Sequence, residues 1–245
     1  MKEYFFNQIG DARMETQNSG NWTALTNHLW ATVDRGDSLP NRALDIIDIG
    51  CHTGGLLALL DKERVRSDAG VSRSHQDGRV RSLAGVQPLD GPRQRAEDRL
   101  PKAKFYADIT DVPSGSVDVV LSHEMLYLIG HDALGIWMDD LRRILRPEGG
   151  AFISLGSHAE NTAWMRWRPR LEELYGHVSE AHDPMYILRE GQLAGFDMEL
   201  HRLHPEPVTS RRYSSPEDGW GEFVSAEEML GFQQKKLVFV CYPNR

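Results

Sequence analysis

A predicted strand, a glycine-rich loop and a predicted helix follow one another between residues 43 and 60. Residues 43–49 (A-L-D-I-I-D-I) are rich in apolar and β-branched types, as is typical of a buried strand in a parallel sheet. The loop D-I-G-C-H-T-G-G (48–55) leads into a helix that is apolar nearly all round. Glycines let a backbone approach a ligand, and free N–H groups at a helix start favour anionic or polar groups. The arrangement predicts a cofactor-binding loop; the alternative is a tight turn that binds nothing.

Strands and helices alternate along the rest of the chain. Further strands are expected at 83–86, 104–107, 117–122, 151–155, 196–203 and 236–242, and helices at 93–100, 134–145, 164–174, before Gly195 and near Ala226. Residues 61–82 are polar and predict an exposed insertion. The alternation predicts an α/β fold with a doubly wound, mostly parallel seven-stranded sheet and a site at the carboxyl ends of its strands. The last two strands follow in succession, which predicts a C-terminal antiparallel hairpin strand at the sheet edge.

The first 40 residues precede the sheet and contain several aromatic side chains, among them Trp22 and Trp30. They predict an N-terminal helical cap or lid over residues 1–40, which leaves residues 41–245 as one α/β domain. This length suits a single domain with one sizeable core.

Composition narrows the classes of partner. Acidic residues outnumber basic ones by 36 to 28, for a net charge of −8, whereas nucleic-acid enzymes usually carry a basic face, so no nucleic-acid partner is expected. No apolar run is long enough for a membrane span or a signal peptide, and no membrane association is expected. Cys51 and Cys241 are the only cysteines, and no histidine has a CxxC or HExxH companion. Neither a disulfide framework nor a metal site is predicted, and a cytoplasmic location is expected.

Five segments together resemble a known family. I-I-D-I-G-C-H-T-G-G (46–55) is similar to motif I of class I S-adenosylmethionine (SAM)-dependent methyltransferases, in which a strand is followed by D-[IVL]-G-C-G-[TS]-G. Its later landmarks follow in order as L-A-G-V-Q-P (83–88), F-Y-A-D-I (105–109), S-G-S-V-D-V-V (114–120) and L-R-R-I-L-R-P-E-G-G (141–150). The shared order and spacing argue against chance agreement. The resemblance implies a Rossmann-like SAM-binding domain over 41–245 and SAM as the cofactor.

The resemblance also assigns cofactor-binding residues. Asp48 and Gly50 would hold the amino-acid end of SAM, and Gly54 would shape the loop. The remaining assignments are Gln87 at the ribose, Asp108 and Ile109 at the adenine, and Ser122 in the lining after the fourth strand. For Asp108, a solvated acidic residue at a strand end is the alternative. Asp118 also matches a family motif, but it starts a strand and is interpreted as structural.

Two cofactor positions depart from the family. His52 replaces the middle glycine of motif I, so an imidazole would stand beside the methionine part of SAM. Gln87 replaces the carboxylate that accepts both ribose hydroxyls, and a neutral amide accepts one hydroxyl and donates to the other. Asp90 is close enough in sequence to compensate. Either these are ordinary variations in a working methyltransferase, or the pocket serves another use of SAM or is degenerate.

Catalytic candidates follow the fourth and fifth strands. His123 and His158 are candidate general bases, because histidine titrates near neutrality, and Tyr127 would orient the nucleophile. Each could instead be an ordinary structural residue, and methyl transfer from a sulfonium needs no base if positioning and water exclusion suffice. Trp164 and Trp167, followed by Tyr175 on the same predicted helix, would cover the acceptor or simply pack. The alternating Arg166, Arg168 and Arg170 suit an anionic acceptor, or are solvated charges.

The function implied by the resemblance is transfer of a methyl group to a small-molecule substrate, a polar or aromatic metabolite. Two alternatives stay open. One is an enzyme of the same fold that does not methylate, but cyclises or fragments SAM or catalyses a pericyclic step. The other is a non-catalytic SAM-binding partner protein. The acceptor, the methylated atom and the oligomeric state are not predicted.

Overall fold

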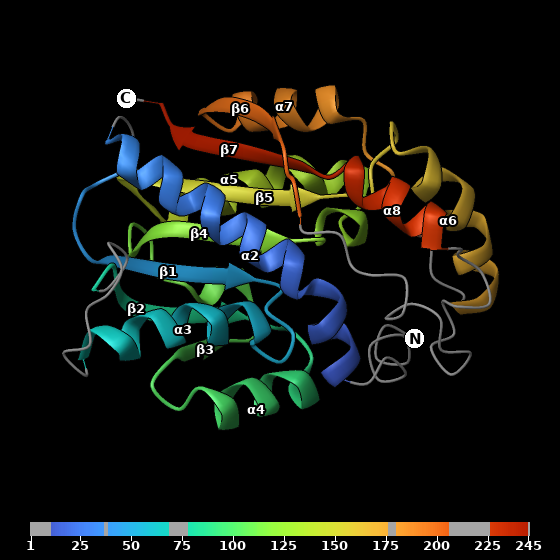
Figure 1. The fold of residues 1–245 in the computed structure, drawn as a ribbon. Coiled ribbons are helices and arrows are strands. Elements are labelled where there is room, and N and C mark those ends of the chain that lie inside the picture. The colour runs from blue at the N-terminus through green and yellow to red at the C-terminus, as the bar shows by residue number, and fades with distance from the viewer. Residues whose placement is uncertain (1–10, 37–38, 69–77, 176–179, 206–225, 245) are drawn as a thin grey trace.

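The computed structural model describes residues 11–36, 39–68, 78–175, 180–205 and 226–244. Seven strands form one sheet in the order β3-β2-β1-β4-β5-β7-β6 (Figure 1). They are β1 (Leu44–Ile49), β2 (Val80–Val86), β3 (Lys104–Tyr106), β4 (Val117–His123), β5 (Leu145–Leu155), β6 (Phe196–Arg202) and β7 (Leu237–Pro243). The first five are parallel, and β7 is antiparallel to both β5 and β6. The expected doubly wound, mostly parallel sheet is confirmed.

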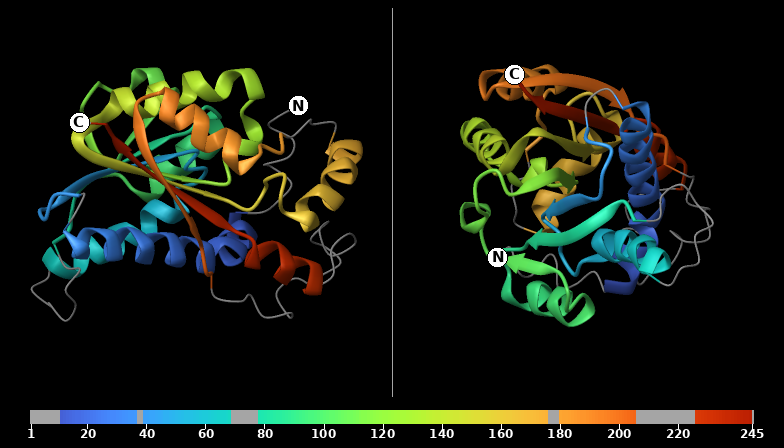
Figure 2. Two further views of the ribbon diagram at one scale, coloured as in Figure 1. Left: turned by 90° about the horizontal axis from the view of Figure 1, so that it is seen from above. Right: turned by 90° about the vertical axis from the view of Figure 1, so that its left-hand side faces the viewer.

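Helices cover both faces of this sheet. The α-helices are α2 (Asp11–Arg35), α3 (Gly55–Asp68), α4 (Asp90–Arg99), α5 (Leu134–Ile144), α6 (Thr162–Tyr175), α7 (Pro184–Leu193) and α8 (Ala226–Gln234). Three short 3₁₀ helices are η1 (Ile109–Asp111), η2 (Leu126–Leu128) and η3 (His131–Ala133). The helices α2 and α3 lie on one face and α5 and α7 on the other, while α6 and α8 lie beyond the carboxyl ends of β4 and β5 (Figures 1 and 2).

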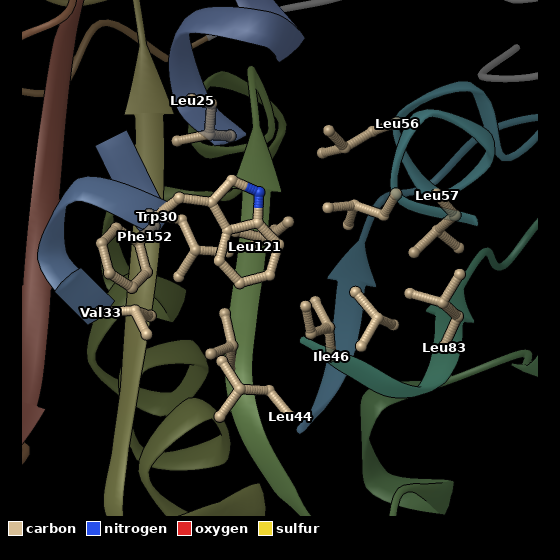
Figure 3. Close-up of a cluster of buried hydrophobic side chains, with 14 of the residues drawn as sticks. Leu25, Trp30, Val33, Leu44, Ile46, Leu56, Leu57, Leu83, Leu121 and Phe152 are labelled. Atoms are coloured by element: carbon tan, nitrogen blue, oxygen red, sulfur yellow. The ribbon is translucent and has the colours of Figure 1, made fainter. Parts of the chain in front are cut away.

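Each face has its own hydrophobic cluster. On the α2 and α3 side, Leu25, Trp30 and Val33 of α2 are buried with Leu121 and Phe152 of the sheet (Figure 3). The opposite cluster joins α5 and α7 to the other face of β1, β4, β5 and β7. Burying both faces explains why β1 and β4 read as nearly continuous apolar runs.

The N-terminal helix α2 packs along the sheet for its last three turns and reaches the carboxyl ends of the strands with its first turns (Figure 1). A Cβ on Gly55, the first residue of α3, would lie 2.3 Å from the Trp22 ring. The described part of the predicted cap is therefore in van der Waals contact with the start of α3.

Two element boundaries differ from the sequence expectation. The polar segment 61–82 is not wholly an insertion, because α3 continues to Asp68 and β2 begins at Val80. The helix α5 ends at Ile144, one residue before its expected end, and β5 begins at Leu145 instead of 151, since Leu145 adopts an extended backbone. The glycine at 149 serves the strand, because a Cβ there would lie 2.6 Å from the Asp118 carbonyl oxygen.

The amino ends of the strands carry a network of charges. Asp118 is buried and accepts hydrogen bonds from Arg42 at 2.6 and 2.9 Å, and Arg146 lies 2.9 Å away. The same carboxylate accepts the backbone N–H of Asp45, and these contacts hold the pKa of Asp118 below its usual range despite its burial. The structural interpretation of Asp118 agrees with this position, because the network lies at the end of the sheet opposite the predicted site.

Candidate active site

The loop after β1 is shaped by three residues with positive φ: Gly50 (+84°), His52 (+48°) and Gly54 (+76°). The Gly50 N–H donates to the carbonyl oxygen of Val86 at the end of β2, 3.0 Å away. A Cβ on Gly50 would lie 2.2 Å from the sulfur of Met125. Only glycine fits at position 50, so the loop and the turn after β4 are in direct contact there.

Asp48 presents a buried carboxyl group beneath this loop. Its residue is 3% exposed, and burial raises its pKa to about 7, because a low-dielectric surrounding disfavours the charged form. Burial is the sole cause of the shift: no donor in the described part of the chain bonds to this carboxylate. The carboxyl group of Asp48 can therefore lose its proton and become negatively charged when a cationic group binds beside it.

His52 adopts a left-handed backbone at φ +48°, a conformation that favours glycine. Its side chain is half-buried. The preceding Cys51 is buried, its thiol pKa is raised by burial, and a Cβ on Gly85 would lie 2.6 Å from its sulfur. The loop therefore holds an imidazole at a position whose backbone conformation favours glycine. The role of His52 beside the cofactor stays a prediction.

Gln87 is buried at the end of β2, where the motif places the ribose contact. Its Oε1 accepts the Leu89 N–H at 3.1 Å, which supports the start of α4, and its backbone carbonyl accepts from Arg93 Nη1 at 2.9 Å. Because Oε1 is engaged, the group left for a ligand is the amide Nε2, a donor. Asp90, the suggested compensating carboxylate, pairs instead with Arg93.

Asp108 and Ile109 lie after β3, as the motif requires. Oδ1 of Asp108 accepts the backbone N–H of Thr110 at 2.8 Å and its hydroxyl at 2.7 Å, and these bonds lower the pKa of the exposed carboxylate. Asp108 therefore caps η1 with one oxygen. Ile109 is half-buried against the hydrophobic cluster of the α5 face. The two adenine assignments stay predictions.

Ser122 lies near the end of β4, and its assignment to the cofactor lining stays a prediction. It is fully buried, and its hydroxyl donates to the Ile49 carbonyl at 3.3 Å. This bond joins β4 to the end of β1 just before the glycine loop. The geometry gives Ser122 a positioning contact with the loop.

His123 is enclosed at the end of β4 with both ring nitrogens engaged. Nδ1 lies 2.7 Å from the Ser154 hydroxyl and Nε2 lies 3.2 Å from Asn18 Oδ1. An amide oxygen only accepts, so Nε2 carries the proton and Nδ1 accepts from Ser154. Burial, followed by the charge of Lys236, lowers the His123 pKa to about 3. The imidazole is neutral at physiological pH, and its lone pair is already occupied.

A buried ion pair that the sequence analysis missed lies beside His123. Glu124 has positive φ (+53°), and its carboxylate accepts from Gly156 N–H at 2.8 Å, from the Ser157 hydroxyl at 2.9 Å and from Lys236 Nζ. Lys236 is 2% exposed and lies over the Phe232 ring at 5.0 Å. These contacts hold the pKa of Glu124 below its usual range. Only the position of Glu124 directly after a strand signalled it, and nothing local marked Lys236.

Aromatic side chains gather next to this ion pair. Tyr127 and Trp164 lie 5.6 Å apart between ring centroids, and Trp167 and Phe232 lie 5.1 Å apart. These four residues pack together between η2, α6 and α8, and are termed the aromatic cluster. Burial and the nearby charge of Glu124 raise the pKa of Tyr127. The predicted position of Tyr175 falls on α6, but its side chain lies outside the described residues.

His158 follows β5 and is buried with one nitrogen bonded. Its Nε2 donates to the Lys235 carbonyl at 2.9 Å, and burial lowers its pKa. Nδ1 is buried and has no hydrogen-bond partner among the described residues. The structure therefore leaves a lone pair unoccupied on His158 but not on His123.

His182 has a similar arrangement and was not singled out as a site residue. Its Nε2 donates to the carbonyls of Leu126 and Ile129, at 3.1 and 2.9 Å, which holds the turn around η2 in place. Of the other histidines considered, His177 lies outside the described residues. Across the described ranges, no group of three His, Cys, Asp or Glu side chains is arranged to hold a metal ion.

Comparisons with known proteins fit this geometry. A family profile described as a methyltransferase domain matches residues 14–201. A search of curated proteins gave no match.

Solved structures share the fold. A chain from the complex between the Haloferax volcanii Trm112 methyltransferase activator and an inferred methyltransferase is 17% identical over 98% of both chains, with a TM-score of 0.67. The geranyl diphosphate C-methyltransferase of Streptomyces coelicolor, bound to Mg²⁺, geranyl diphosphate and S-adenosyl-L-homocysteine (SAH), is 13% identical over 91% of this chain and 78% of that one, with a TM-score of 0.57. The [4+2]-cyclase SpnF is 13% identical over 83% and 76%, with a TM-score of 0.51. At these identities the likeness shows the fold alone.

Proposed function

Because this chain belongs to the class I SAM-dependent methyltransferase family, whose cofactor is SAM, we propose that it transfers the SAM methyl group to a small-molecule acceptor. The observation that carries the proposal is the buried carboxyl group of Asp48 beneath a loop that only glycine can form at position 50. A buried carboxyl group that accepts no hydrogen bond from the described residues suits a ligand with an ammonium and a sulfonium. SAM supplies an activated methyl group, and the residues of this chain bind and orient it.

The residues present suit the cofactor, with altered residues at positions 52 and 87. Asp48 would pair with the ammonium, and the backbone of the Gly50 loop would line the amino-acid end. At the ribose, Gln87 would donate from Nε2 to a hydroxyl oxygen, whereas a family carboxylate would accept from it. Asp108 keeps one oxygen free of the η1 cap for the adenine end.

Loss of a proton from the acceptor accompanies methylation of a hydroxyl or amine. Of the two candidate bases, His158 has the unoccupied lone pair, on Nδ1, whereas that of His123 accepts from Ser154. The contacts therefore favour His158 as the base. His123 would instead be a neutral side chain that lines the site and donates a hydrogen bond to Asn18 of α2. Tyr127, with its raised pKa, would act as a hydrogen-bond donor.

Calorimetric titration with SAH tests the cofactor site. The chain should bind one equivalent, and Asp48→Asn should weaken binding about 10- to 100-fold, the cost of losing a charged partner. Asp139→Asn, an exposed acidic position on α5, is the matched control and should bind normally. Absence of SAH binding at millimolar concentration would overturn the proposal.

A SAM enzyme that does not methylate remains the second candidate, favoured by His52 and Gln87. The fold likeness to a [4+2]-cyclase shows that this architecture is not confined to methyltransferases. Mass analysis of products formed from SAM, with and without candidate acceptors, separates the two: a methylated acceptor and SAH support methyl transfer, whereas a product formed from SAM alone supports the alternative.

The third candidate is a non-catalytic SAM-binding partner protein. The H. volcanii complex, in which a methyltransferase activator accompanies an inferred methyltransferase, supports a protein partner for this chain but not a loss of catalysis. Tight SAH binding with no product under any condition would favour this third candidate. No helix in the described ranges is both long and apolar enough to cross a bilayer. The cytoplasmic location, the absence of a nucleic-acid partner and the 1–40 cap remain proposals.

A further inference from the structure

The aromatic cluster and the Glu124–Lys236 pair occupy one end of the molecule. Figure 1 shows α6 and α8 lying together beyond the carboxyl ends of β4 and β5. Phe232 joins the two groups, because its ring lies 5.0 Å from Lys236 Nζ and 5.1 Å from the Trp167 ring centroid. The cluster therefore borders the carboxyl ends of β4 and β5, at the same edge of the sheet as the predicted SAM loop after β1.

Two buried hydrogen-bond donors in this region are not fully used. Trp164 is 4% exposed, and its indole N–H has no acceptor among the described residues. The ammonium of Lys236 has three N–H groups, of which the described contacts engage one with Glu124 and direct one face to the Phe232 ring. A buried donor left unpaired is costly, so an oxygen atom of a bound ligand would stabilise these groups.

The charges here already balance. The carboxylate of Glu124 and the ammonium of Lys236 form a one-to-one pair, and the His123 imidazole between the pair and α2 is neutral. Adding an anion would place two negative groups on one ammonium in a buried setting, which is unfavourable. A neutral ligand avoids this cost.

We propose that the acceptor is a neutral aromatic compound with a hydroxyl or carbonyl oxygen, anchored by the Trp164 indole N–H and the Lys236 ammonium. This inference rests on the proposed function, since it names the acceptor class of that site. The rings of Trp164 and Trp167 are buried in the cluster, and a planar ligand would stack against the partly buried rings of Tyr127 and Phe232. The two donors fix its oxygen.

Three naphthalene probes that differ in the substituent at position 2 test the inference on the full chain saturated with SAH: 2-naphthol, 2-naphthoate and 2-methylnaphthalene. Their dissociation constants are measured by ligand-detected NMR. We expect 2-naphthol to bind about tenfold more tightly than 2-methylnaphthalene, because only its oxygen satisfies the buried donors. It should also bind more tightly than 2-naphthoate. Equal binding of all three, tighter binding of the carboxylate, or no binding of any probe would overturn the inference.

Trp164→Phe removes the indole N–H while keeping an aromatic ring. It should weaken 2-naphthol binding about tenfold and leave 2-methylnaphthalene unchanged. Trp137→Phe on α5, the same substitution on the opposite face of the sheet, should change neither. If Trp164→Phe does not fold, the double variant Glu124→Gln/Lys236→Met removes the second donor without leaving an unpaired charge, and should lose the same preference. An unaltered preference in the folded variants would overturn the inference.

The SAH titration separates the two levels of proposal. SAH binding without oxygen-dependent probe binding contradicts the acceptor class and leaves the proposed function standing. Failure of SAH binding contradicts the proposed function itself.

Discussion

Asp48 carries a carboxyl group whose pKa is raised to about 7 by burial at the end of β1. An unfolded chain ionises this group near pH 4, so the unfolded state is favoured as pH rises from about 4 to about 7. The cofactor-free protein therefore gains nothing from a charged Asp48. Burying this carboxyl group lowers the free energy of unfolding but leaves a group that can pair with a cation, a compromise that is common at functional sites.

This gives a prediction with a definite sign. Asp48→Asn should raise the free energy of unfolding of the SAH-free protein by about 2–4 kcal/mol at pH 8. At pH 4 it should raise it by little, because the carboxyl group is then protonated in the folded state and only about half ionised in the unfolded state. Denaturant unfolding of both proteins at the two pH values measures it. A variant less stable than the parent at pH 8 would show that Asp48 is stabilised by contacts rather than destabilised by burial.

Gln87 gives a prediction about the ribose contact. Gln87→Glu retains an oxygen for the Leu89 N–H and replaces the free amide donor by a second acceptor, so SAH binding should persist or strengthen severalfold. Gln87→Ala should weaken binding and also shorten or destabilise the start of α4. Calorimetry and the melting temperature distinguish these effects. Abolished binding in Gln87→Glu together with normal binding in Gln87→Ala would contradict the assignment.

The two histidines of the site are distinguished by NMR without any acceptor. His123 and His158 should both be in the Nε2–H tautomer, because each donates from that nitrogen to an oxygen. With a pKa of about 3, His123 should show no protonation between pH 5 and 8. Long-range ¹H–¹⁵N spectra, assigned with His123→Gln and His158→Gln, report both. A His123 that titrates near pH 6.5 would restore it as a base of ordinary strength.

Among the elements, α2 and α3 are joined by a contact that glycine permits. Because a Cβ on Gly55 would reach within 2.3 Å of the Trp22 ring, Gly55→Ala should force the start of α2 away from α3. We expect a loss of about 1–3 kcal/mol in the free energy of unfolding, the usual cost of overpacking. In a Trp22→Leu background the same change should cost little. Gly231→Ala on α8, where a Cβ meets open space, is the control; additive effects of the Gly55 and Trp22 changes would contradict the contact.

The same contact bears on the predicted cap. The first turns of α2 supply Asn18 to His123 and Trp22 to α3. Displacing them should therefore alter the tautomer or environment of His123, which couples the N-terminal helix to the acceptor side of the site.

At the level of the whole molecule, the sequence predicts those features that depend on residues close together in the chain. The glycine pattern after β1 and the apolar runs of β1 and β4 place Asp48 and Gln87 at the carboxyl ends of neighbouring strands, as the structure has them. The boundaries of α3 and β5 were missed because tertiary contacts set them: Gly149 is packed against the Asp118 carbonyl, which no local pattern reveals.

The acceptor side was harder to predict because it is assembled from distant segments. Glu124 and Lys236 are 112 residues apart, and His123 and Asn18 are 105 apart. The first pairing depends on β7 lying beside β5, and the second depends on α2 packing against the sheet. A charged residue at a strand start is normally solvated, so Lys236 carried no signal that it would be buried.

The position of β7 has a dynamic consequence. In this sheet β6 pairs only with β7, and β7 alone joins it to β5. If β7 opens from β5, two strands leave the sheet at once, and Lys236, which precedes β7, is withdrawn from Glu124. Native-state hydrogen exchange should then detect β6 and β7 as one cooperative unit with a shared opening free energy. The same fluctuation would dismantle the acceptor side while leaving Asp48 and the glycine loop on β1 intact, so that the protein would alternate between a state that holds only its cofactor and a state that can hold both ligands.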